Sequence, residues 1–407
     1  MPTLLQINIT ANWGSHGKIA EGIGKIAIAN GWESYIAYGR WMNPSQSKLY
    51  HIGSNLDEAI HGISSRIFDN HGLMSHRATQ KLIEFIDRIQ PDIIHLHNIH
   101  GYYLNYPILC RYLAKLNKPV VWTLHDCWPY TGHCAHYMFA QCERWKKHCH
   151  SCPLKRNYPK SILFERSYQN YEDKQNAFLS IPNLTIVPVS KWLQTDLQSS
   201  FLQNCIIEQI YNGIDTNIFH IYPDTDVMKQ QLGIPIENKV VLGVASNWYH
   251  KGLDDFIALN QVLPQNYTII LVGLKQKEMK QLPTGIIGIE RTENIEQLCK
   301  FYSLADVYFN PTWEDTFPTT NIEAMACGTP VITYNTGGSP EAVDKHTGYV
   351  IAKGDIGSAC LHIQSMCQKE NIYTQKCRQR VLNHFNQDER FAEYFCLYKK
   401  LLDIICK

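Results

Sequence analysis

Residues 310–341 read NPTWEDTFPTTNIEAMACGTPVITYNTGGSPE and decide the fold that we expect for this chain. Residues 306–309 predict a strand before this stretch, residues 330–334 predict a second strand after it, and a helix opens between them. The loop ahead of the helix carries Glu314 and Asp315. A strand–loop–helix turn directs backbone N–H groups at an anion, and carboxylates accept hydrogen bonds from hydroxyl groups, so the stretch suits a sugar nucleotide.

The start of this helix also has a purely local interpretation. Thr320-x-x-Glu323 fits a capping box, in which the glutamate satisfies the N-terminus of its own helix instead of meeting a ligand. The four residues alone do not separate the two interpretations, because the pattern is common. The longer string around them favours the ligand.

That longer string resembles the signature of retaining glycosyltransferases of family 4. The family carries two acidic residues separated by seven others, followed by an Ala-Met-Ala-x-Gly-x-Pro-Val run. Here Glu323 and AMACGTPV match the second acid and the run, while Asp315 or its neighbour Glu314 takes the place of the first acid. The resemblance is closest to transferases of bacterial capsule, exopolysaccharide or lipopolysaccharide assembly. It implies an α/β protein of the GT-B fold, with two Rossmann-like domains facing an interdomain cleft.

Length and composition fit this expectation. A chain of 407 residues suits two domains of about 200 residues each. The 38 basic and 37 acidic side chains give a net charge of +1, which argues against a nucleic-acid partner. The N-terminus lacks the regions of a secretory signal, and no apolar stretch has the length that spans a bilayer, so we expect a cytoplasmic protein.

Short β-rich runs alternate with helical patterns, which predicts parallel α/β sheets. The expected strands are residues 4–9, 34–38, 93–97, 120–124 and 184–189 in the first half and 240–244, 268–272, 286–290, 307–309 and 331–333 in the second. The resemblance implies an N-terminal acceptor-side domain at 1–210, with a Cys-rich loop at 127–156, and a nucleotide-sugar-binding domain at 211–384. A C-terminal helix at 385–407 is expected to pack back on the N-terminal domain.

Two loops of the first domain are expected to meet the ligand. After the first strand, Gly14 and Gly17 let the backbone approach a ligand closely before a helix at Ile19, and a tight strand-to-helix turn is the alternative. His125 leaves the end of a strand, where open α/β sheets bind ligands. The resemblance implies that His125 contacts the transferred sugar. Asp126, next to it in the chain, could orient its ring or a nearby loop. A histidine bonded within a turn is the alternative.

In the second domain, Lys251 follows a strand, and a fixed ammonium there can neutralise a departing diphosphate. The resembled family usually places an arginine about five residues earlier, where this chain has Ser246 and Asn247. His250 and Arg291 are the candidate substitutes. An exposed lysine at a helix start is the alternative interpretation of Lys251.

The resemblance assigns further roles in the second domain. Glu323 is expected on the ribose, Lys251 on the diphosphate, and Glu314 or Asp315 on outer hydroxyls of the sugar. Backbone amides of residues 316–319 are expected to hold phosphate and sugar. The expected catalytic residues are His125, Glu314 and Asp315, and the expected donor-binding residues are Gly14, Gly17, Asn247, Lys251, Thr316, Phe317, Pro318, Thr319 and Glu323.

The segment 127–156 is unusually rich in cysteine. Its four most closely spaced thiols could form a structural zinc site, although free cysteines and disulfides fit the spacing as well. These candidate zinc ligands are Cys134, Cys142, Cys149 and Cys152. Several lysines and arginines interleave with them, and this basic patch could attract an acceptor's phosphate or an anionic membrane surface. A solvated surface is the alternative.

No metal is expected in catalysis, since GT-B enzymes in general need none. Asp224-Thr-Asp226 spells the D-x-D of metal-dependent sugar transferases, but it precedes a helix whose N-terminus acidic residues stabilise. His95 and His97 alternate onto one face of their strand, which favours packing or support of the site over metal binding.

We therefore predict a retaining glycosyltransferase that moves a hexosyl-type sugar from a nucleotide-sugar donor to a glycan or lipid-linked acceptor in bacterial surface polysaccharide synthesis. Peripheral contact with the cytoplasmic membrane face is part of this prediction. The alternative from a different class is a nucleotide-sugar-binding subunit without turnover, which would bind donor but release no nucleotide in response to acceptor. A nucleotide-sugar epimerase is a further alternative.

Overall fold

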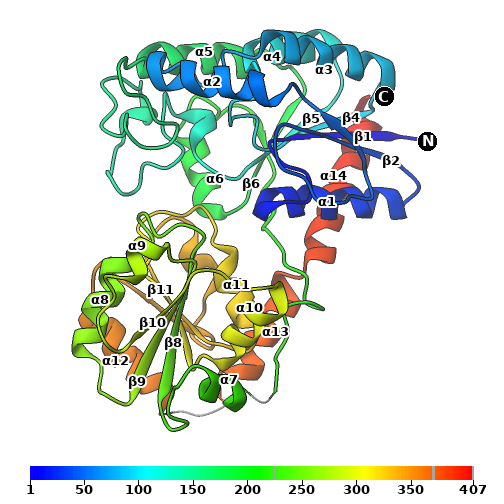
Figure 1. Cartoon of the computed structure of the whole chain (residues 1–407). Helices are drawn as coiled ribbons and strands as arrows, with labels where there is room; N and C mark the ends of the chain where they lie inside the picture. Colours follow the sequence, from blue (N-terminus) through cyan, green and yellow to red (C-terminus); the bar gives the residue numbers. More distant parts are fainter. Residues whose placement is uncertain (224, 369–371, 406–407) are drawn as a thin grey trace. The chain divides into compact units, whose positions relative to one another are not determined.

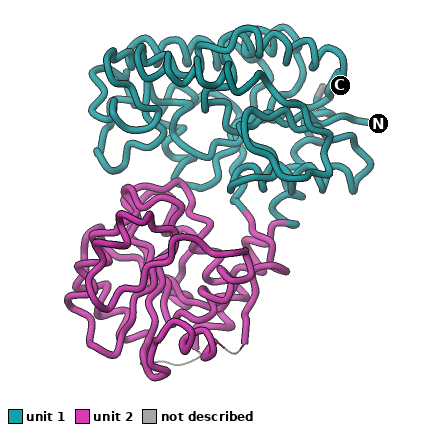
Figure 2. Tube along the Cα trace, viewed as in Figure 1, with its two compact units in different colours: residues 1–212, 388–407 teal, residues 213–387 magenta. Residues whose placement is uncertain are grey.

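A computed structural model of the chain describes residues 1–223, 225–368 and 372–405 (Figure 1). The chain divides into two compact units (Figure 2). The first unit comprises Met1–Asn212 and Asp388–Lys407, and the second comprises Gly213–Gln387. Each unit is an α/β structure built on its own parallel sheet.

The first unit contains a seven-stranded sheet in the order β3-β2-β1-β4-β5-β6-β7. Its strands are β1 (Thr3–Asn8), β2 (Glu33–Tyr38), β3 (Lys48–His51), β4 (Ile93–Leu96), β5 (Val120–Leu124), β6 (Leu184–Pro188) and β7 (Ile206–Ile207). All neighbouring strands pair in parallel. Strands such as β5, with the sequence VVWTL, are buried along their whole length, which is typical of a parallel sheet covered on both faces.

Helices cover this sheet (Figure 1). They are α1 (Gly14–Ala29), α2 (Asn55–Phe68), α3 (His76–Ile89), α4 (Tyr106–Leu116), α5 (Ser167–Leu179), α6 (Lys191–Gln198) and α14 (Gln387–Ile405). The last of these belongs to the first unit despite its place at the C-terminus. Phe391, Tyr394 and Tyr398 of α14 share a buried core with Leu4 of β1 and Val121 of β5.

The second unit contains a six-stranded parallel sheet in the order β10-β9-β8-β11-β12-β13. Its strands are β8 (Lys239–Val244), β9 (Tyr267–Val272), β10 (Ile286–Ile289), β11 (Val307–Asn310), β12 (Val331–Tyr334) and β13 (Gly348–Ile351). Its helices are α7 (Asp226–Gln231), α8 (Leu253–Val262), α9 (Gln276–Met279), α10 (Ile295–Leu304), α11 (Thr319–Ala326), α12 (Ile356–Cys367) and α13 (Thr374–His384).

Strand order reverses once in each sheet, and this positions the candidate site. In the first sheet the reversal lies between β1 and β4, and in the second it lies between β8 and β11. Loops leaving the carboxyl ends of such neighbouring strands diverge and leave a crevice for a ligand. Most of the residues for which the sequence predicts donor binding follow β8 and β11, and the remaining two, Gly14 and Gly17, follow β1.

Several elements differ from the sequence expectation. Helix α1 begins at Gly14, whereas the sequence predicted a helix from Ile19. The short strands β3, β7 and β13 were not predicted. Asp224 of the D-x-D motif lies outside the described residues, and Asp226 is the first residue of α7. None of the helices in the described ranges is both long and apolar enough to cross a membrane.

Candidate functional site

Lys251 connects the two loops that flank the strand reversal of the second unit. Its Nζ donates to Asp315 Oδ2 at 2.6 Å, to the Glu314 carbonyl oxygen at 2.8 Å and to Thr312 Oγ1 at 3.3 Å. The lysine follows β8 and the three acceptors follow β11, its neighbour in the sheet. The ammonium is therefore fixed at the carboxyl edge of the sheet, and the structure brings Lys251, Glu314 and Asp315 together.

The carboxylate of Glu314 lies beside this lysine and faces His250. Its Oε1 is 3.1 Å from His250 Nδ1. Its other oxygen, Oε2, is buried and has no hydrogen-bond partner among the described residues. Because a buried carboxylate oxygen without a partner is energetically costly, this atom is suited to accept a hydrogen bond from a ligand hydroxyl group.

Helix α11 begins directly after these acidic residues. Its N-cap, Pro318, makes no side-chain cap bond, and the first turn contains no acidic residue. No acidic side chain within the first turn therefore offsets the partial positive charge of the helix N-terminus. Asp315 Oδ1 accepts a hydrogen bond from Phe317 N at 3.2 Å, which bends the loop into the helix. Thr316 and Phe317 are buried, so residues 316–319 form a packed turn.

The capping-box interpretation of Thr320 and Glu323 is wrong. Glu323 is the fifth residue of α11 and lies beyond its first turn. Its Oε2 accepts a hydrogen bond from the hydroxyl of Tyr302, on α10, at 2.9 Å. A side chain of another helix therefore orients this carboxylate.

The loop after β8 depends on one glycine. Gly252 has a φ of 81°, and a Cβ there would lie 2.4 Å from the Pro311 carbonyl oxygen. Only glycine permits this approach of the two loops. Asn247 is exposed, and its Oδ1 accepts from Tyr249 N at 3.2 Å in a local turn. Arg291 is also exposed and lies after β10, two strands away from β8.

In the first unit, Gly14 and Gly17 have different local roles. Gly14 is the first residue of α1 and has a φ of 65°, and a Cβ at this position would have no neighbouring heavy atom within 4 Å. Gly17 is inside the helix, and a Cβ there would lie 2.6 Å from Thr10 Oγ1. The expected glycine loop is thus a helix start, and Gly17 is explained by packing of α1 against the residues after β1.

His125 lies after β5 and contacts His97, which follows β4. His125 Nε2 is 3.2 Å from His97 Nδ1, and His97 Nε2 is 3.0 Å from Gln6 Oε1. Gln6 Nε2 in turn lies 2.7 Å from the carbonyl oxygen of Ala20. Burial holds the pKa of both histidines well below the ordinary value, so the two rings are neutral at pH 7.

This chain of contacts assigns the proton positions. A carbonyl oxygen only accepts, so the Gln6 amide donates to Ala20 and presents its oxygen to His97. Neutral His97 then donates from Nε2 and accepts at Nδ1. Consequently His125 donates from Nε2, and its Nδ1 carries the lone pair. The sequence gives no signal for Gln6, which is a polar residue within an apolar strand.

The prediction that Asp126 orients His125 is not what the contacts show. Asp126 Oδ2 is 2.8 Å from His100 Nε2, and its Oδ1 accepts from Trp128 N at 2.9 Å. Although burial opposes ionisation, His100 and these hydrogen bonds lower the pKa of Asp126 well below its ordinary value. Asp126 therefore holds the following loop, the second of the two roles expected for it, while His97 contacts the ring of His125.

The Cys-rich segment folds around one small cavity. Four cysteines line it together with His133 and His150: Cys134, Cys142, Cys149 and Cys152. Buried Lys174 holds the segment from α5, since its Nζ donates to the Trp128 and Thr131 carbonyl oxygens at 2.7 and 2.9 Å. No group of three or more metal-ligating side chains with metal-binding geometry occurs in the described part of the chain. The zinc site stays a prediction.

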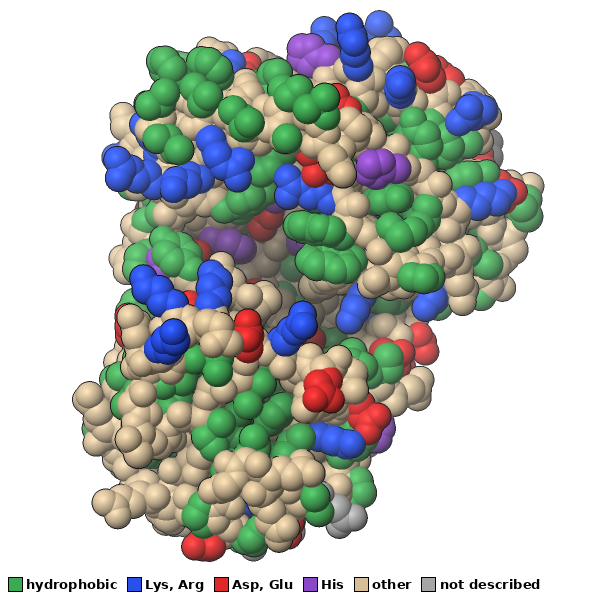
Figure 3. All heavy atoms as spheres, in the orientation of Figure 1, with side chains coloured by type: hydrophobic (Ala, Val, Ile, Leu, Met, Phe, Trp, Pro, Cys, Tyr) green, Lys and Arg blue, Asp and Glu red, His purple; other side chains and the backbone are tan. Residues whose placement is uncertain are grey.

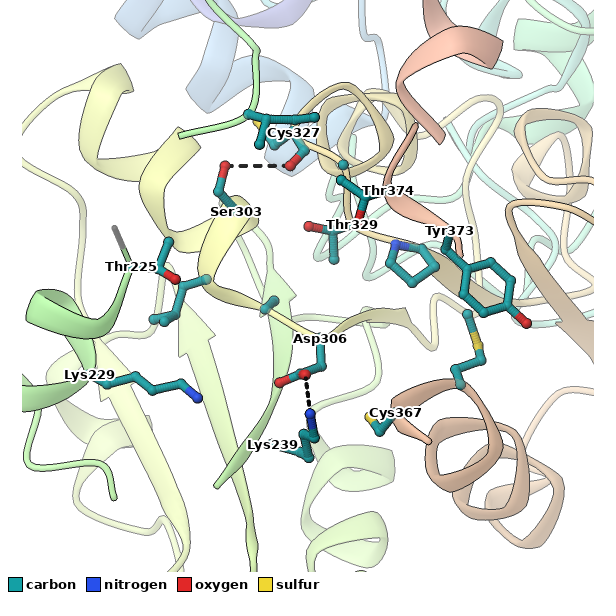
Figure 4. A pocket seen from close by; sticks show the side chains of 16 residues that line it. Thr225, Lys229, Lys239, Ser303, Asp306, Cys327, Thr329, Cys367, Tyr373 and Thr374 are labelled. Atoms are coloured by element: carbon teal, nitrogen blue, oxygen red, sulfur yellow. Dashed lines mark hydrogen bonds and ion pairs between the residues drawn. The ribbon is translucent and has the colours of Figure 1, made fainter. Parts of the chain in front are cut away.

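A larger cavity lies at the opposite edge of the second sheet (Figure 4). Lys239 at the start of β8 and Asp306 before β11 line it and form an ion pair with an N–O distance of 3.3 Å. Thr329 and Pro330, which precede β12, also line it. None of the predicted donor-binding residues takes part, so this cavity is separate from the loops around Lys251.

Comparisons with known proteins agree with this architecture. The family description "Glycosyltransferase Family 4" matches residues 27–218, and "Glycosyl transferases group 1" matches residues 238–369. WcaC of Escherichia coli (strain K12), described as a colanic acid biosynthesis glycosyl transferase, is 24% identical over 369 residues, covering 87% of this chain and 88% of that protein.

Solved structures with the same fold include a sucrose-phosphate synthase from Thermosynechococcus elongatus, with a TM-score of 0.73, 17% identity and coverage of 99% and 100% of the two chains. Anabaena Alr3699/HepE in complex with UDP has a TM-score of 0.67, 15% identity and coverage of 97% and 100%. At these identities the likeness concerns the fold.

Two parallel-sheet α/β units, each with one strand reversal, define the GT-B fold. Two glycosyltransferase family descriptions cover most of both units, so the chain is a glycosyltransferase, and its residues 27–218 match family 4.

Proposed function

We propose that this glycosyltransferase transfers a hexosyl-type sugar from a nucleotide-sugar donor to a glycan or lipid-linked acceptor, with retention of anomeric configuration, in bacterial surface polysaccharide synthesis. The observation that carries the proposal is the position of Lys251. It joins the loops after β8 and β11 through Asp315, beside the uncapped N-terminus of α11. A fixed cation and a helix N-terminus together form an environment suited to a diphosphate.

The remaining side chains divide the donor between them. Glu323, oriented by Tyr302, accepts hydrogen bonds from the ribose hydroxyls. Glu314 offers its buried Oε2 to an outer hydroxyl of the sugar, and Asp315 holds Lys251 and the turn into α11.

The proposed reaction needs no covalent intermediate on the enzyme. The bond between the anomeric carbon and the diphosphate breaks, and an oxocarbenium-like sugar forms. The acceptor hydroxyl attacks from the same face, and the departing diphosphate takes its proton. Lys251 stabilises the charge that develops on the leaving group, an interaction that strengthens as the bond breaks.

Support for the donor class and the pathway comes from related proteins. HepE was solved in complex with UDP and with UDP-glucose, and WcaC is described as acting in colanic acid biosynthesis. We extend both features to this chain as proposals: a nucleotide-sugar donor and an acceptor in surface polysaccharide assembly. A cytoplasmic location with peripheral membrane contact is part of the same proposal.

The test is acceptor-dependent release of nucleoside diphosphate. UDP-, GDP- and ADP-hexoses are incubated with the protein, with and without membrane extract as a source of lipid-linked and glycan acceptors. Release that requires the extract, together with a product that keeps the donor's anomeric configuration by NMR, supports the proposal. Lys251→Met should abolish release, whereas Lys345→Met, a change at an exposed lysine of the same unit, should not. Inverted configuration or release independent of acceptor contradicts it.

A further inference from the structure

Helix α2 buries its polar and small residues and exposes its apolar residues, the opposite of an ordinary surface helix. Its buried residues are His61, Gly62 and Ser65, which are polar or small. The side chains of Leu56, Ile60 and Ile63, by contrast, are 69%, 49% and 59% exposed. Their spacing of four and three residues puts them on one face of the helix. An amphipathic helix normally buries its apolar face, so an outward apolar face indicates that something else covers it.

A neighbouring segment extends this apolar surface. Ile162 N donates to the Arg66 carbonyl oxygen at 2.7 Å, and Phe164 N donates to the Ile67 carbonyl oxygen at 3.0 Å. The rings of Phe68 and Phe164 stack with centroids 5.6 Å apart. The exposed large side chains of both elements form what we call the apolar patch: Leu56, Ile60, Ile63, Phe68, Ile162, Leu163 and Phe164.

The patch is fixed before any partner binds. Asp69, the C-cap of α2, is buried and accepts hydrogen bonds from Arg166 N and His133 Nδ1 at 2.8 and 2.6 Å. Ser161 Oγ donates to the Phe164 carbonyl oxygen at 2.7 Å. Because these contacts order both elements, binding through the patch costs little conformational entropy.

Basic side chains border the apolar patch. Arg66, Arg156 and Lys160 are exposed, and Lys155 Nζ donates to the Leu163 carbonyl oxygen at 3.0 Å. Figure 3 shows hydrophobic side chains gathered over α2 and, next to them, a row of lysine and arginine side chains.

The nearby acidic groups are engaged by the protein itself. Glu58 forms an ion pair with Arg40 at 2.9 Å, and Asp57 Oδ2 accepts from Ser54 Oγ at 2.7 Å. Glu165 Oε1 accepts from the backbone N–H groups of Cys152 and Ser167 at 3.2 and 2.9 Å. The hydrogen bonds to Asp57 and Glu165 leave both carboxylates charged, but Arg66, Lys155, Arg156 and Lys160 outnumber them, so the border of the patch is net positive.

We propose that the apolar patch and its basic border dock the first unit onto an anionic lipid bilayer. Apolar side chains enter the boundary between headgroups and acyl chains, and the basic border meets anionic headgroups. The inference deepens the proposed function, since a lipid-linked acceptor would lie in that bilayer. A second copy of this chain would match the apolar side chains but would bring its own positive border against this one.

Vesicle co-sedimentation tests the docking surface. The full chain is mixed with vesicles of phosphatidylethanolamine and phosphatidylglycerol, or of phosphatidylcholine alone. We expect preferential binding to the anionic vesicles that weakens with salt. Replacing Ile60 and Ile63 by serine should weaken vesicle binding by at least about tenfold for each side chain, because each variant loses the hydrophobic free energy of burying an isoleucine side chain in the bilayer. Leu361→Ser, at a side chain 69% exposed in the second unit, is the control and should bind as wild type.

A second pair of substitutions tests the charge independently. Arg156→Gln with Lys160→Gln should weaken binding to anionic vesicles by about fivefold per residue and leave binding to neutral vesicles unchanged. Wild-type protein that ignores both kinds of vesicle overturns the proposal. So does a dimer in sedimentation velocity that the Ile60 and Ile63 substitutions dissociate, because the patch would then join two copies. Binding of a sugar nucleotide is measured in a separate assay. It tests the proposed function independently of whether the protein binds vesicles.

Discussion

Acidification should unfold the first unit, because several of its histidines are buried in the neutral form. Burial is the main cause that lowers the pKa of His16 to about 4 and that of His61 to about 3, from the ordinary value of 6.5. The unfolded chain then binds more protons than the folded chain below pH 6.5. The contribution of these histidines to the unfolding free energy is therefore fully present above pH 6.5. It is lost as the pH falls from 6.5 towards the folded pKa values.

The size of the effect follows from the two values. A pH of 5 is about 1.5 units below the unfolded pKa of each histidine and above its folded pKa. Keeping each ring neutral therefore lowers the unfolding free energy by about 2 kcal/mol. The pair therefore costs about 4 kcal/mol, a large share of the 5–15 kcal/mol that is roughly typical of folded proteins. His71, His95, His97 and His125 act in the same direction, since burial also holds their pKa values well below 6.5. His133 acts in the opposite direction, because Asp69 raises its pKa.

Urea unfolding at pH 7.5, 6.5, 5.5 and 5.0 measures this loss. We expect the unfolding free energy of the first unit to fall by at least about 4 kcal/mol between pH 7.5 and 5.0. His61→Gln should reduce that fall by about 2 kcal/mol, and His346→Gln, at an exposed position, should leave it unchanged. A free energy that stays constant down to pH 5 refutes the assignment of neutral buried histidines.

Three further predictions concern the site and the Cys-rich segment. Glu323→Ala should weaken donor binding by about 1.5–3 kcal/mol in calorimetry, and unchanged affinity would remove Glu323 from the ribose. Nitrogen-15 spectra of labelled histidines should show the His125 proton on Nε2. Gln6→Met should mix the two tautomers of His125, and Thr123→Val should not. A proton on Nδ1 in the wild-type protein would contradict the hydrogen bonds assigned from Gln6 through His97 to His125. The predicted ligand set of four cysteines implies about one zinc ion per chain in elemental analysis, lost in Cys149→Ser but kept in Cys396→Ser. Metal-free wild-type protein would contradict that set and leave the alternatives of free or disulfide-bonded cysteines.

The sequence predicts those parts of the fold that depend on local pattern. Strand β5 lies at Val120–Leu124, as its continuous apolar run predicts. Strand β3, with the sequence KLYH, has no such run because it is the partly exposed edge of its sheet. Strand β7 has two residues, too few for a periodic pattern. A strand that is buried on both faces has a continuous apolar run that predicts it, and edge strands lack such a run.

The site shows the same division between local and distant information. The loop with Glu314 and Asp315 could be predicted from the sequence because its residues are adjacent in the chain. Sequence proximity left two roles open for Asp126, and its carboxylate contacts His100 and the backbone N–H of Trp128 in the following loop. The contact between His97 and His125 arises because β4 and β5 pair in the sheet, 28 residues apart in the chain. Such pairs depend on the strand order, which no local pattern encodes.

Binding of a sugar nucleotide is the central claim, and a thermal-shift screen tests it most directly. Purified protein is heated with UDP-, GDP- and ADP-sugars and with the free nucleotides. A ligand present at one hundred times its dissociation constant adds about 2.7 kcal/mol of stability. We predict a clear rise in melting temperature with one nucleotide and its sugar conjugates, lost in Lys251→Met. No shift with any of them would contradict a donor site around Lys251.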